Sequence, residues 1–194
     1  MQQFLKYLEK NPKKVLIFDF DETLFTLELP WHIFFNGLVE RLQELDPGLH
    51  EERSIVALEH RAVRQFGNKA NKIINHWSNE FERQYLQGVS EHISLTNFIR
   101  KRSAEYDIFL WTSNTRGTVE PILKEVHILS YFQRTVTADD VRMIKPDPEG
   151  FDLIRTDNRP LDEFLMIGDS SNDQEAAAAA GIDFFKVDHD EQDT

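Results

Sequence analysis

Hydrophobic positions follow two spacings along this chain, one typical of buried strands and one typical of amphipathic helices. Continuous apolar runs predict strands over residues 15–20, 106–111, 133–137, 164–167 and 184–187. Apolar residues three and four apart predict helices over residues 1–10, 93–102, 119–126, 149–155 and 174–180. Pro121 lies near the start of its helix, where a first turn accepts proline. Alternating strands and helices form a parallel sheet covered on both faces, so the predicted fold class is α/β.

A longer helical pattern interrupts this alternation after the first strand. Helical spacing of apolar residues predicts helices over residues 30–45, 51–66 and 71–86, with turns at residues 46–48 and 67–68. We therefore predict a core built from residues 1–26 and 91–194. Residues 27–90, called the helical block below, are predicted to be an insertion into that core.

Polar side chains follow three of the predicted strands at their carboxyl ends. They are Asp19 and Asp21, then Thr112, Ser113 and Asn114, then Asp169 and Asp173. Ligands of open parallel sheets bind beyond the carboxyl ends of the strands. We therefore expect these side chains to meet at one edge of the sheet.

Asp19 and Asp21 directly follow the apolar run Val15-Leu16-Ile17-Phe18. Side chains two residues apart point to the same side if the chain stays extended. Two like charges held together cost free energy unless a cation lies between them. Mg²⁺ prefers oxygen ligands, so a Mg²⁺ ion with an anionic substrate accounts for both aspartates. A polar loop with Thr23 as a helix N-cap accounts for only one.

The other stretches each have a purely structural alternative. Asp173 or Ser171 could cap the alanine-rich helix that follows them. Lys145, in Lys145-Pro146-Asp147-Pro148, could be a solvated surface lysine instead of a phosphate ligand. Thr112-Ser113-Asn114 could be a plain turn instead of a set of donors for phosphate oxygens. These alternatives stay open for each stretch taken alone.

Composition narrows the function classes. The 194 residues carry a formal net charge of −12 and include no cysteine. The charge argues against a nucleic-acid or anionic-membrane partner, and the lack of cysteine excludes disulfides and thiolate metal sites. No signal peptide or membrane span is predicted, which favours a cytoplasmic location. The acidic end, residues 188–194, is predicted to be a frayed tail.

Four stretches, in this order, resemble the motifs of the haloacid dehalogenase-like hydrolase superfamily. They are Asp19-Phe20-Asp21-Glu22-Thr23-Leu24, Thr112-Ser113-Asn114, Lys145-Pro146-Asp147-Pro148 and Gly168-Asp169-Ser170-Ser171-Asn172-Asp173. Their order and spacing match over roughly residues 14–187. The resemblance implies a Rossmann-like three-layer core with a small α-helical cap inserted after the first motif, where the helical block lies.

The resemblance also implies roles for individual residues. Asp19 would be the nucleophile that forms an aspartyl-phosphate, and Asp21 the general acid and base. Thr112, Ser113 and Asn114 would bind the phosphoryl group, and Lys145 would hold Asp19 and the phosphate together. The implied Mg²⁺ ligands are Asp19, Asp21 through its backbone oxygen, Asp169, and Asp173 directly or through water.

The favoured function is therefore a Mg²⁺-dependent phosphatase, a phosphoric monoester hydrolase acting on a small phosphorylated metabolite. Asp21 argues against a carbon–halogen hydrolase, because a halide leaving group needs no acid. A sugar-phosphate mutase with the same aspartates remains an alternative, and a non-catalytic binding protein is a further one. Both a monomer and a homodimer are compatible with the sequence. Candidates for substrate selection in the helical block are His32, Arg64, His76, Trp77 and Arg83.

Overall fold

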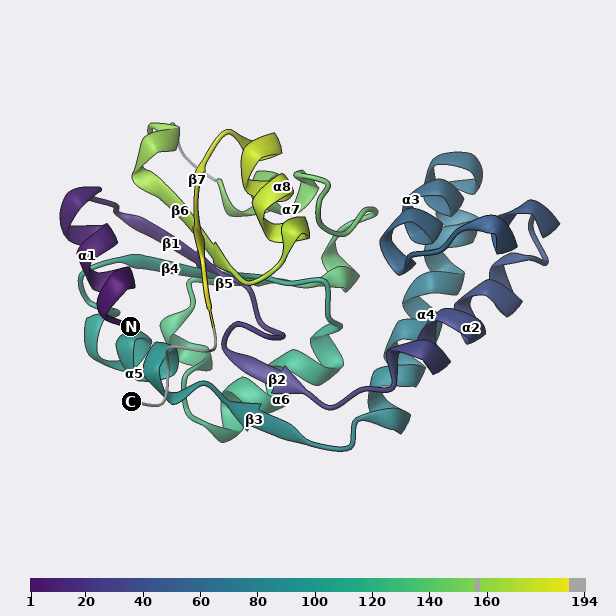
Figure 1. Ribbon diagram of the computed structural model, residues 1–194, viewed down its shortest axis with the longest axis horizontal. Helices are drawn as coiled ribbons and strands as arrows, with labels where there is room; N and C mark the ends of the chain where they lie inside the picture. Colours follow the sequence, from purple (N-terminus) through teal and green to yellow (C-terminus); the bar gives the residue numbers. More distant parts are fainter. Residues whose placement is uncertain (156–157, 189–194) are drawn as a thin grey trace.

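The computed structural model describes residues 1–155 and 158–188, so the predicted tail lies outside the described residues from position 189 onward. A five-stranded parallel sheet in the order β5-β4-β1-β6-β7 forms the centre of the protein (Figure 1). Its strands are β1 (Val15–Phe18), β4 (Asp107–Trp111), β5 (Arg134–Val136), β6 (Phe164–Gly168) and β7 (Asp183–Lys186). The predicted α/β class with a parallel sheet is confirmed.

Side chains alternate between the two faces of the sheet, as the two-residue period of a strand requires. In β1, Leu16 and Phe18 join one hydrophobic cluster while Val15 and Ile17 join a second. All four are buried, because helices cover both faces. This explains why the strand reads as a continuous apolar run and not as an alternating one.

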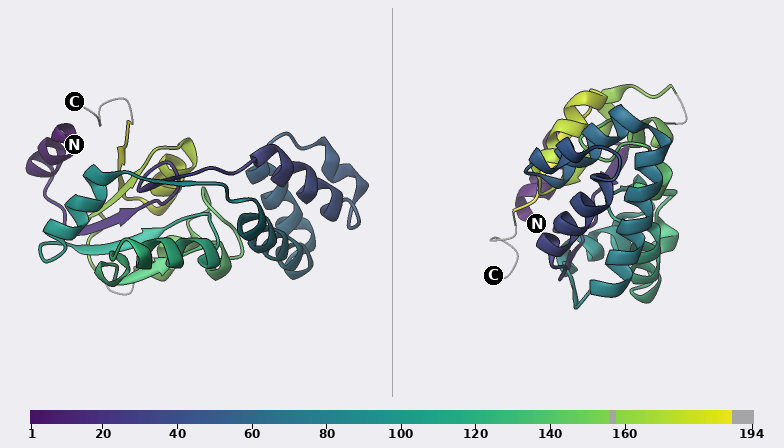
Figure 2. Two further views of the ribbon diagram at one scale, coloured as in Figure 1. Left: turned by 90° about the horizontal axis from the view of Figure 1, so that it is seen from below. Right: turned by 90° about the vertical axis from the view of Figure 1, so that its right-hand side faces the viewer.

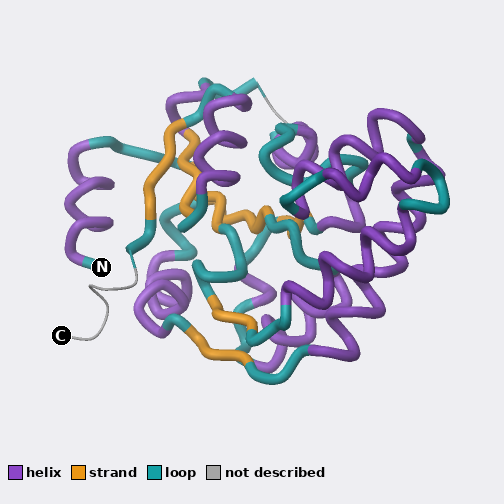
Figure 3. The backbone as a smooth tube through the Cα atoms, turned by 45° about the vertical axis from the view of Figure 1, so that its right-hand side comes forward, coloured by secondary structure: helices purple, strands orange, loops and turns teal. Residues whose placement is uncertain are grey.

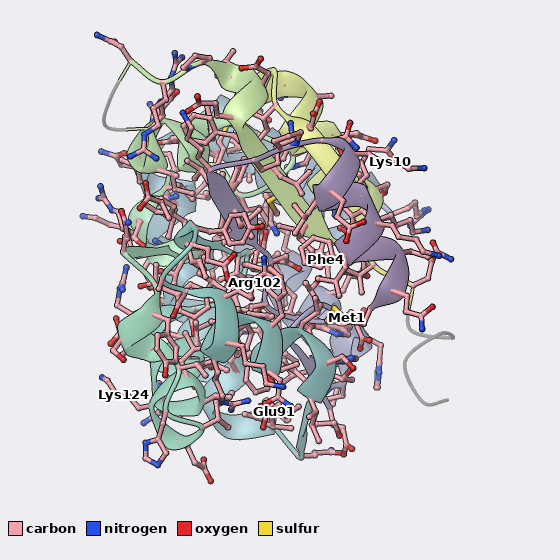
Figure 4. The ribbon with its side chains drawn as sticks, turned by 90° about the vertical axis from the view of Figure 1, so that its left-hand side faces the viewer. Met1, Phe4, Lys10, Glu91, Arg102 and Lys124 are labelled. Carbon is pink, nitrogen blue, oxygen red and sulfur yellow. The ribbon has the colours of Figure 1, made fainter. Side chains whose placement is uncertain are left out.

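Helices α1 (Gln2–Lys10), α5 (Ile93–Arg102) and α6 (Arg116–Glu125) cover one face of the sheet. Helices α7 (Glu149–Ile154) and α8 (Ser171–Ala180) cover the other face. Phe4 points from α1 toward the core, while Lys10 at the end of the helix is exposed (Figure 4). Short 3-10 helices complete the connections: η1 (Pro47–Glu51), η2 (Leu129–Tyr131), η3 (Ala138–Asp140) and η4 (Leu161–Glu163).

The helical block extends from the carboxyl edge of the sheet and gives the protein an elongated shape (Figure 2). It contains α2 (Trp31–Leu42), α3 (Ile55–Phe66) and α4 (Asn68–Tyr85). These helices bury a hydrophobic cluster of their own, centred on Phe34, Leu38, Trp77 and Phe81. Gly67 adopts φ +56° between α3 and α4, a conformation that favours glycine, so the two helices can fold back on each other.

A two-stranded antiparallel ribbon joins the helical block to the core, and the sequence did not predict it (Figure 3). It pairs β2 (Phe25–Leu27) with β3 (Val89–Glu91). Each strand has only three residues, too short to show a periodic pattern. The division of the chain at residues 27 and 90 stays a prediction.

Several helices begin at other residues than predicted, because either a local cap or a contact with another element fixes their first turn. Helix α6 begins at Arg116, whose backbone N–H donates to Asp139 Oδ2 at 2.7 Å. Pro121 therefore lies in the helix interior and not in its first turn. Helix α3 begins at Ile55 instead of residue 51, because Ser54 accepts a hydrogen bond from the backbone of Ala57. In the described part of the chain, no helix combines the length and apolar character needed to cross a bilayer.

Candidate active site

The predicted site residues converge at the carboxyl edge of the sheet. Strand β1 ends at Phe18, two residues earlier than predicted, but Asp19 continues its ladder by donating its backbone N–H to Ile167 of β6 at 2.9 Å. Thr112 directly follows β4 and its backbone N–H donates to Val136 of β5 at 2.9 Å. Parallel pairing of the strands thus places the three motifs at one edge of the sheet, as expected for residues that follow the carboxyl ends of parallel strands.

Lys145 is fully enclosed between two carboxylates. Its Nζ lies 2.5 Å from Asp19 Oδ1 and also donates to Asp173 Oδ1. Lys145 is 3% exposed. The alternative interpretation of Lys145 as a solvated surface lysine is therefore wrong. Burial alone lowers the pKa of Lys145, but the two carboxylates outweigh it and leave the pKa raised, so the ammonium stays charged.

Asp173 performs the capping role and contacts the site at the same time. Its Oδ2 accepts hydrogen bonds from the backbone N–H and the hydroxyl of Ser170, and Ser170 Oγ accepts from the Asp173 backbone at 3.2 Å. This capping box starts α8 at Ser171, earlier than predicted, with Ser170 as the N-cap instead of Ser171 or Asp173. A Cβ at Gly168 would lie 2.5 Å from the Asp173 carboxyl carbon, so only glycine leaves room for this carboxylate.

Asp21 occupies a separate position on the edge of the ribbon. Its Oδ1 accepts a hydrogen bond from the backbone N–H of Leu27 in β2 at 2.8 Å. Burial raises the pKa of Asp21 to about 7, against the opposing effect of the Leu27 N–H. A carboxyl group with a pKa near neutrality can both donate and accept a proton at physiological pH.

The residues at this edge fit a Mg²⁺ ion. One carboxylate oxygen from each of Asp19, Asp169 and Asp173 lies within 4.8 Å of the others. Burial, with Asp173 as an additional cause, raises the pKa values of both Asp19 and Asp169, while Lys145 opposes this at both. Mg²⁺ prefers hard oxygen donors such as these carboxylates. Its positive charge would also offset their mutual repulsion. The carboxylate of Asp21 is outside this group, and its contribution through a backbone oxygen stays a prediction.

The stretch Thr112-Ser113-Asn114 forms a tight polar turn. Thr112 Oγ1 donates to Asn114 Oδ1 at 2.9 Å and accepts from the Asn114 backbone N–H at 3.1 Å. Thr112 and Asn114 are buried, and Ser113 is partly exposed. Thr112, Ser113 and Asn114 all line the cavity that also contains Asp19 and Lys145.

This cavity, with a volume of about 290 Å³, lies between the sheet edge and the helical block. Its core side holds the predicted residues Asp19, Asp21, Lys145 and Asp169. Its other side is formed by residues of the helical block: Trp31, Phe34, Ile55, Val56, Glu59, His60, Val63, Asn71, Ile74, Asn75, Ser78 and Glu82. The structure thus brings the four motifs to one cavity, with Asp173 directly behind Lys145.

Helix α4 carries a polar stripe that was not predicted from the sequence. Asn71, Asn75, Ser78 and Glu82 are spaced four, three and four residues apart, so they share one helix face, and all line the cavity. Glu82 accepts hydrogen bonds from the Thr115 hydroxyl at 2.6 Å and from the Thr115 backbone. Their spacing of three and four residues, which is the helical period, is the signal in the sequence that could have identified this stripe.

The five candidates for substrate selection in the helical block do not line this cavity as the structure describes it. His32, Arg64, His76 and Arg83 are exposed. Trp77 is buried in the hydrophobic cluster, and its Nε1 donates to the Phe34 carbonyl at 2.9 Å. The helical phase places four of them on the solvent side, including His32, which lies close to the first motif in the sequence.

Glu59 of α3 is expected to make the protein less stable as the pH rises. Burial, together with the nearby Glu82, raises the pKa of Glu59 from 4.5 to about 8. The native state therefore binds a proton more tightly than the unfolded state, and stability falls between these two pH values. The loss is on the order of 1.4 kcal/mol for each pH unit in that range.

Glu59→Gln is expected to be more stable than the unchanged protein at pH 8 and close to it at pH 5, as measured by urea unfolding. Glu80→Gln is the matched control, because Glu80 is a partly exposed residue of α4 that pairs with Arg41. An equal pH dependence in all three proteins would contradict this account of Glu59.

Comparison with known proteins agrees with these motifs. The sequence model of the haloacid dehalogenase-like hydrolase family matches residues 16–187. A phosphoglycolate phosphatase from Salmonella choleraesuis is 39% identical over 73 residues, which are 37% of this chain and 29% of that protein. A phosphoglycolate phosphatase from Nitrosospira multiformis is 32% identical over 93 residues, covering 44% of this chain and 38% of that protein. The matches thus span well under half the length of these relatives.

Solved structures show the same fold. A HAD-superfamily hydrolase from Geobacter sulfurreducens has a TM-score of 0.54 at 18% identity, covering 90% of this chain and 86% of that one. A HAD family enzyme from Bacteroides thetaiotaomicron has a TM-score of 0.54 at 20% identity, covering 92% of this chain and 95% of that one. The predicted Rossmann-like core is therefore confirmed. Because the family model matches most of the sequence, this chain belongs to the haloacid dehalogenase-like hydrolase family.

Proposed function

We propose that this protein is a Mg²⁺-dependent phosphatase that hydrolyses phosphomonoesters of small metabolites. The observation that carries the proposal is the convergence of Asp19, Asp21, Thr112 and Lys145 on one cavity. A nucleophile, a proton carrier, a hydroxyl and a buried cation are together what phosphoryl transfer to a carboxylate requires. The phosphatase names of the partial relatives support the same reaction class.

In the first step, a carboxylate oxygen of Asp19 attacks phosphorus. An O–P bond forms to Asp19 while the bond from phosphorus to the alcohol oxygen breaks. Asp21 donates its proton to the departing alkoxide, which leaves as the alcohol. The pKa of about 7 makes the protonated form of Asp21 available near neutral pH.

In the second step, Asp21, now a carboxylate, accepts a proton from a water molecule that attacks the phosphorus atom. The bond between phosphorus and Asp19 breaks, which releases inorganic phosphate and restores both aspartates. Lys145 holds Asp19 in place through both steps, since its ammonium is itself fixed by Asp173. The Thr112 hydroxyl is positioned to donate to a phosphate oxygen if it exchanges its bond to Asn114.

Asp19, Asp169 and the backbone oxygen of Asp21 would hold the Mg²⁺ ion. Asp173 already uses both carboxylate oxygens on Lys145 and Ser170, which supports a contact through water over direct ligation. When bound, Mg²⁺ supplies positive charge that offsets the charge of the phosphoryl group.

We also propose that the helical block acts as a cap. Its contacts with core loops are polar: His60 Nε2 lies 2.9 Å from the carbonyl of Ile144, and Asn71 donates to the carbonyl of Arg142 at 2.9 Å. Polar contacts can be exchanged for water at modest cost, so such a cap could open for substrate entry and product release.

The test of the proposed function is release of inorganic phosphate from p-nitrophenyl phosphate in the presence of MgCl2. Catalytic release is expected from the unchanged protein and is expected to cease when EDTA removes the metal. Transfer of phosphate to a second sugar phosphate without net release would instead support the mutase alternative. Absence of both reactions would contradict an enzymatic role.

Mg²⁺ is also expected to raise the thermal midpoint of unfolding. It binds the native carboxylate group and not the unfolded chain, so at a hundredfold excess over Kd it adds about 2.7 kcal/mol. For a chain of this size that corresponds to several degrees. Asp169→Asn is expected to lose this increase, whereas Asp152→Asn, at an exposed position on α7, is expected to keep it. An undiminished increase in Asp169→Asn would exclude Asp169 as a ligand.

A further inference from the structure

The wall of the cavity opposite the phosphate-binding motifs has an unusual charge distribution. The helical block supplies two carboxyl groups to this wall, Glu59 from α3 and Glu82 from α4. Among the described residues of the helical block that line the cavity, the only basic side chain is His60, and its Nε2 is bonded to the Ile144 carbonyl. The wall facing the alcohol part of a substrate therefore offers hydrogen-bond acceptors and no lysine or arginine.

Glu59 is the member of the pair without a partner. It is 5% exposed and lines the cavity. Within the described residues, its carboxyl group makes no hydrogen bond and no salt bridge. The nearby carboxyl group of Glu82 repels its charged form. Burying a carboxyl group without a hydrogen-bond donor costs free energy. An unpartnered carboxyl group inside a binding cavity therefore indicates that the ligand supplies the donor.

Glu82 differs because the protein already satisfies it. Its carboxylate accepts from the Thr115 hydroxyl at 2.6 Å, the Thr115 backbone at 3.1 Å and the Asn114 amide at 3.4 Å. These bonds fix Glu82 between α4 and the turn that follows β4. Glu82 thus contributes negative potential, while Glu59 contributes an open acceptor.

The cations that line the cavity from the core side are committed elsewhere. Lys145 is bonded to Asp19 and Asp173. The side chain of Arg142 is 76% exposed and pairs with Glu149 at 3.5 Å. Lys145 is therefore not available to offset a carboxylate of the substrate near Glu59.

We propose that the cavity selects phosphomonoesters whose alcohol part carries an ammonium group, with Glu59 as the specificity-determining residue that binds it. This inference rests on the proposed phosphatase function and names its substrate class. An ammonium group supplies the donor that Glu59 lacks, and its positive charge favours the carboxylate form of Glu59 over the protonated form that burial and Glu82 favour in the free protein. A carboxylate in the same place would meet two carboxyl groups in a low-dielectric site. The selection thus differs from that named for the phosphoglycolate phosphatases, whose substrate bears a carboxylate.

The test compares three esters with a two-carbon alcohol part and a different terminal charge: 2-aminoethyl phosphate, ethyl phosphate and phosphoglycolate. Their kcat/KM values are expected to fall in that order, by roughly tenfold at each step, the size of one charge-assisted hydrogen bond. An ester that is not turned over is ranked by its inhibition constant against p-nitrophenyl phosphate. Equal values, or a preference for phosphoglycolate, would overturn the proposal.

Substitution separates Glu59 from the general effect of the protein's negative charge. Glu59→Gln is expected to reduce the preference for 2-aminoethyl phosphate over ethyl phosphate to about twofold or less. Glu80→Gln makes the same substitution outside the cavity and is expected to retain the full preference. Retention of the preference in Glu59→Gln would overturn the assignment. If Glu59→Gln does not fold, the ester series on the unchanged protein decides the outcome.

Failure of this inference is distinguishable from failure of the phosphatase function. If p-nitrophenyl phosphate is hydrolysed but the esters are ranked otherwise, the substrate class is wrong and the reaction stands. If no ester is hydrolysed, p-nitrophenyl phosphate included, the phosphatase function is wrong, and the substrate class is overturned with it.

Discussion

Asp19→Asn is expected to reduce phosphate release by at least about a thousandfold. The amide has the shape of the carboxylate but is a poor nucleophile, so it cannot form the bond to phosphorus. Lys145 keeps Asp173 as its partner in this variant, so the folded state is not expected to be lost. The measurement is the steady-state rate of phosphate release from p-nitrophenyl phosphate.

The control for this substitution is Asp152→Asn, which changes the same residue type at an exposed position on α7. It is expected to leave the rate within about twofold of the unchanged protein, as surface substitutions usually do. A rate for Asp19→Asn close to that of the control would show that Asp19 is not the nucleophile.

Lys145→Met is expected to remove activity and to destabilise the protein by about 3–5 kcal/mol. The substitution keeps an unbranched side chain of similar size but leaves Asp19 and Asp173 buried without a cation. Removing one partner from a buried ion pair is costly because the remaining charges stay desolvated. Asp19 also loses the group that orients it. The measurements are urea unfolding at neutral pH and phosphate release.

Lys14→Met is the matched control for Lys145→Met. Lys14 pairs with Glu163 at 2.6 Å, but its side chain is 69% exposed. Exposed ion pairs contribute about 0–1 kcal/mol, so a small change in stability and an unchanged rate are expected. An equal effect of the two substitutions would contradict a specific role for Lys145.

The sequence was sufficient to predict the sheet and the position of the site. Buried parallel strands read as continuous apolar runs, and β1 is such a run. The polar residues after β1, β4 and β6 then lie at one edge whatever the details of the loops. Asp173 shows the limit of that argument, because one carboxyl group takes part in the capping box of α8 and also contacts Lys145 at the site.

The side of the site formed by the helical block could not be predicted in the same way. Glu59 and Glu82 lie on amphipathic helices, where a glutamate is usually solvated. They line the cavity only because α3 and α4 pack against loops more than thirty residues away in the sequence, as the bond from Thr115 to Glu82 shows. The beginning of α6 was misplaced for the same reason, since Asp139 of η3 accepts a hydrogen bond from the Arg116 backbone.

The central claim is that Asp19 carries the phosphoryl group during turnover, and trapping that intermediate tests it most directly. Borohydride reduces an acyl phosphate to an alcohol, so adding it to the protein during turnover of p-nitrophenyl phosphate should convert residue 19 to homoserine. Peptide mass spectrometry is expected to find this conversion at position 19, only when substrate and Mg²⁺ are both present. Continued phosphate release with residue 19 unmodified, or with another carboxylate modified instead, would contradict the account.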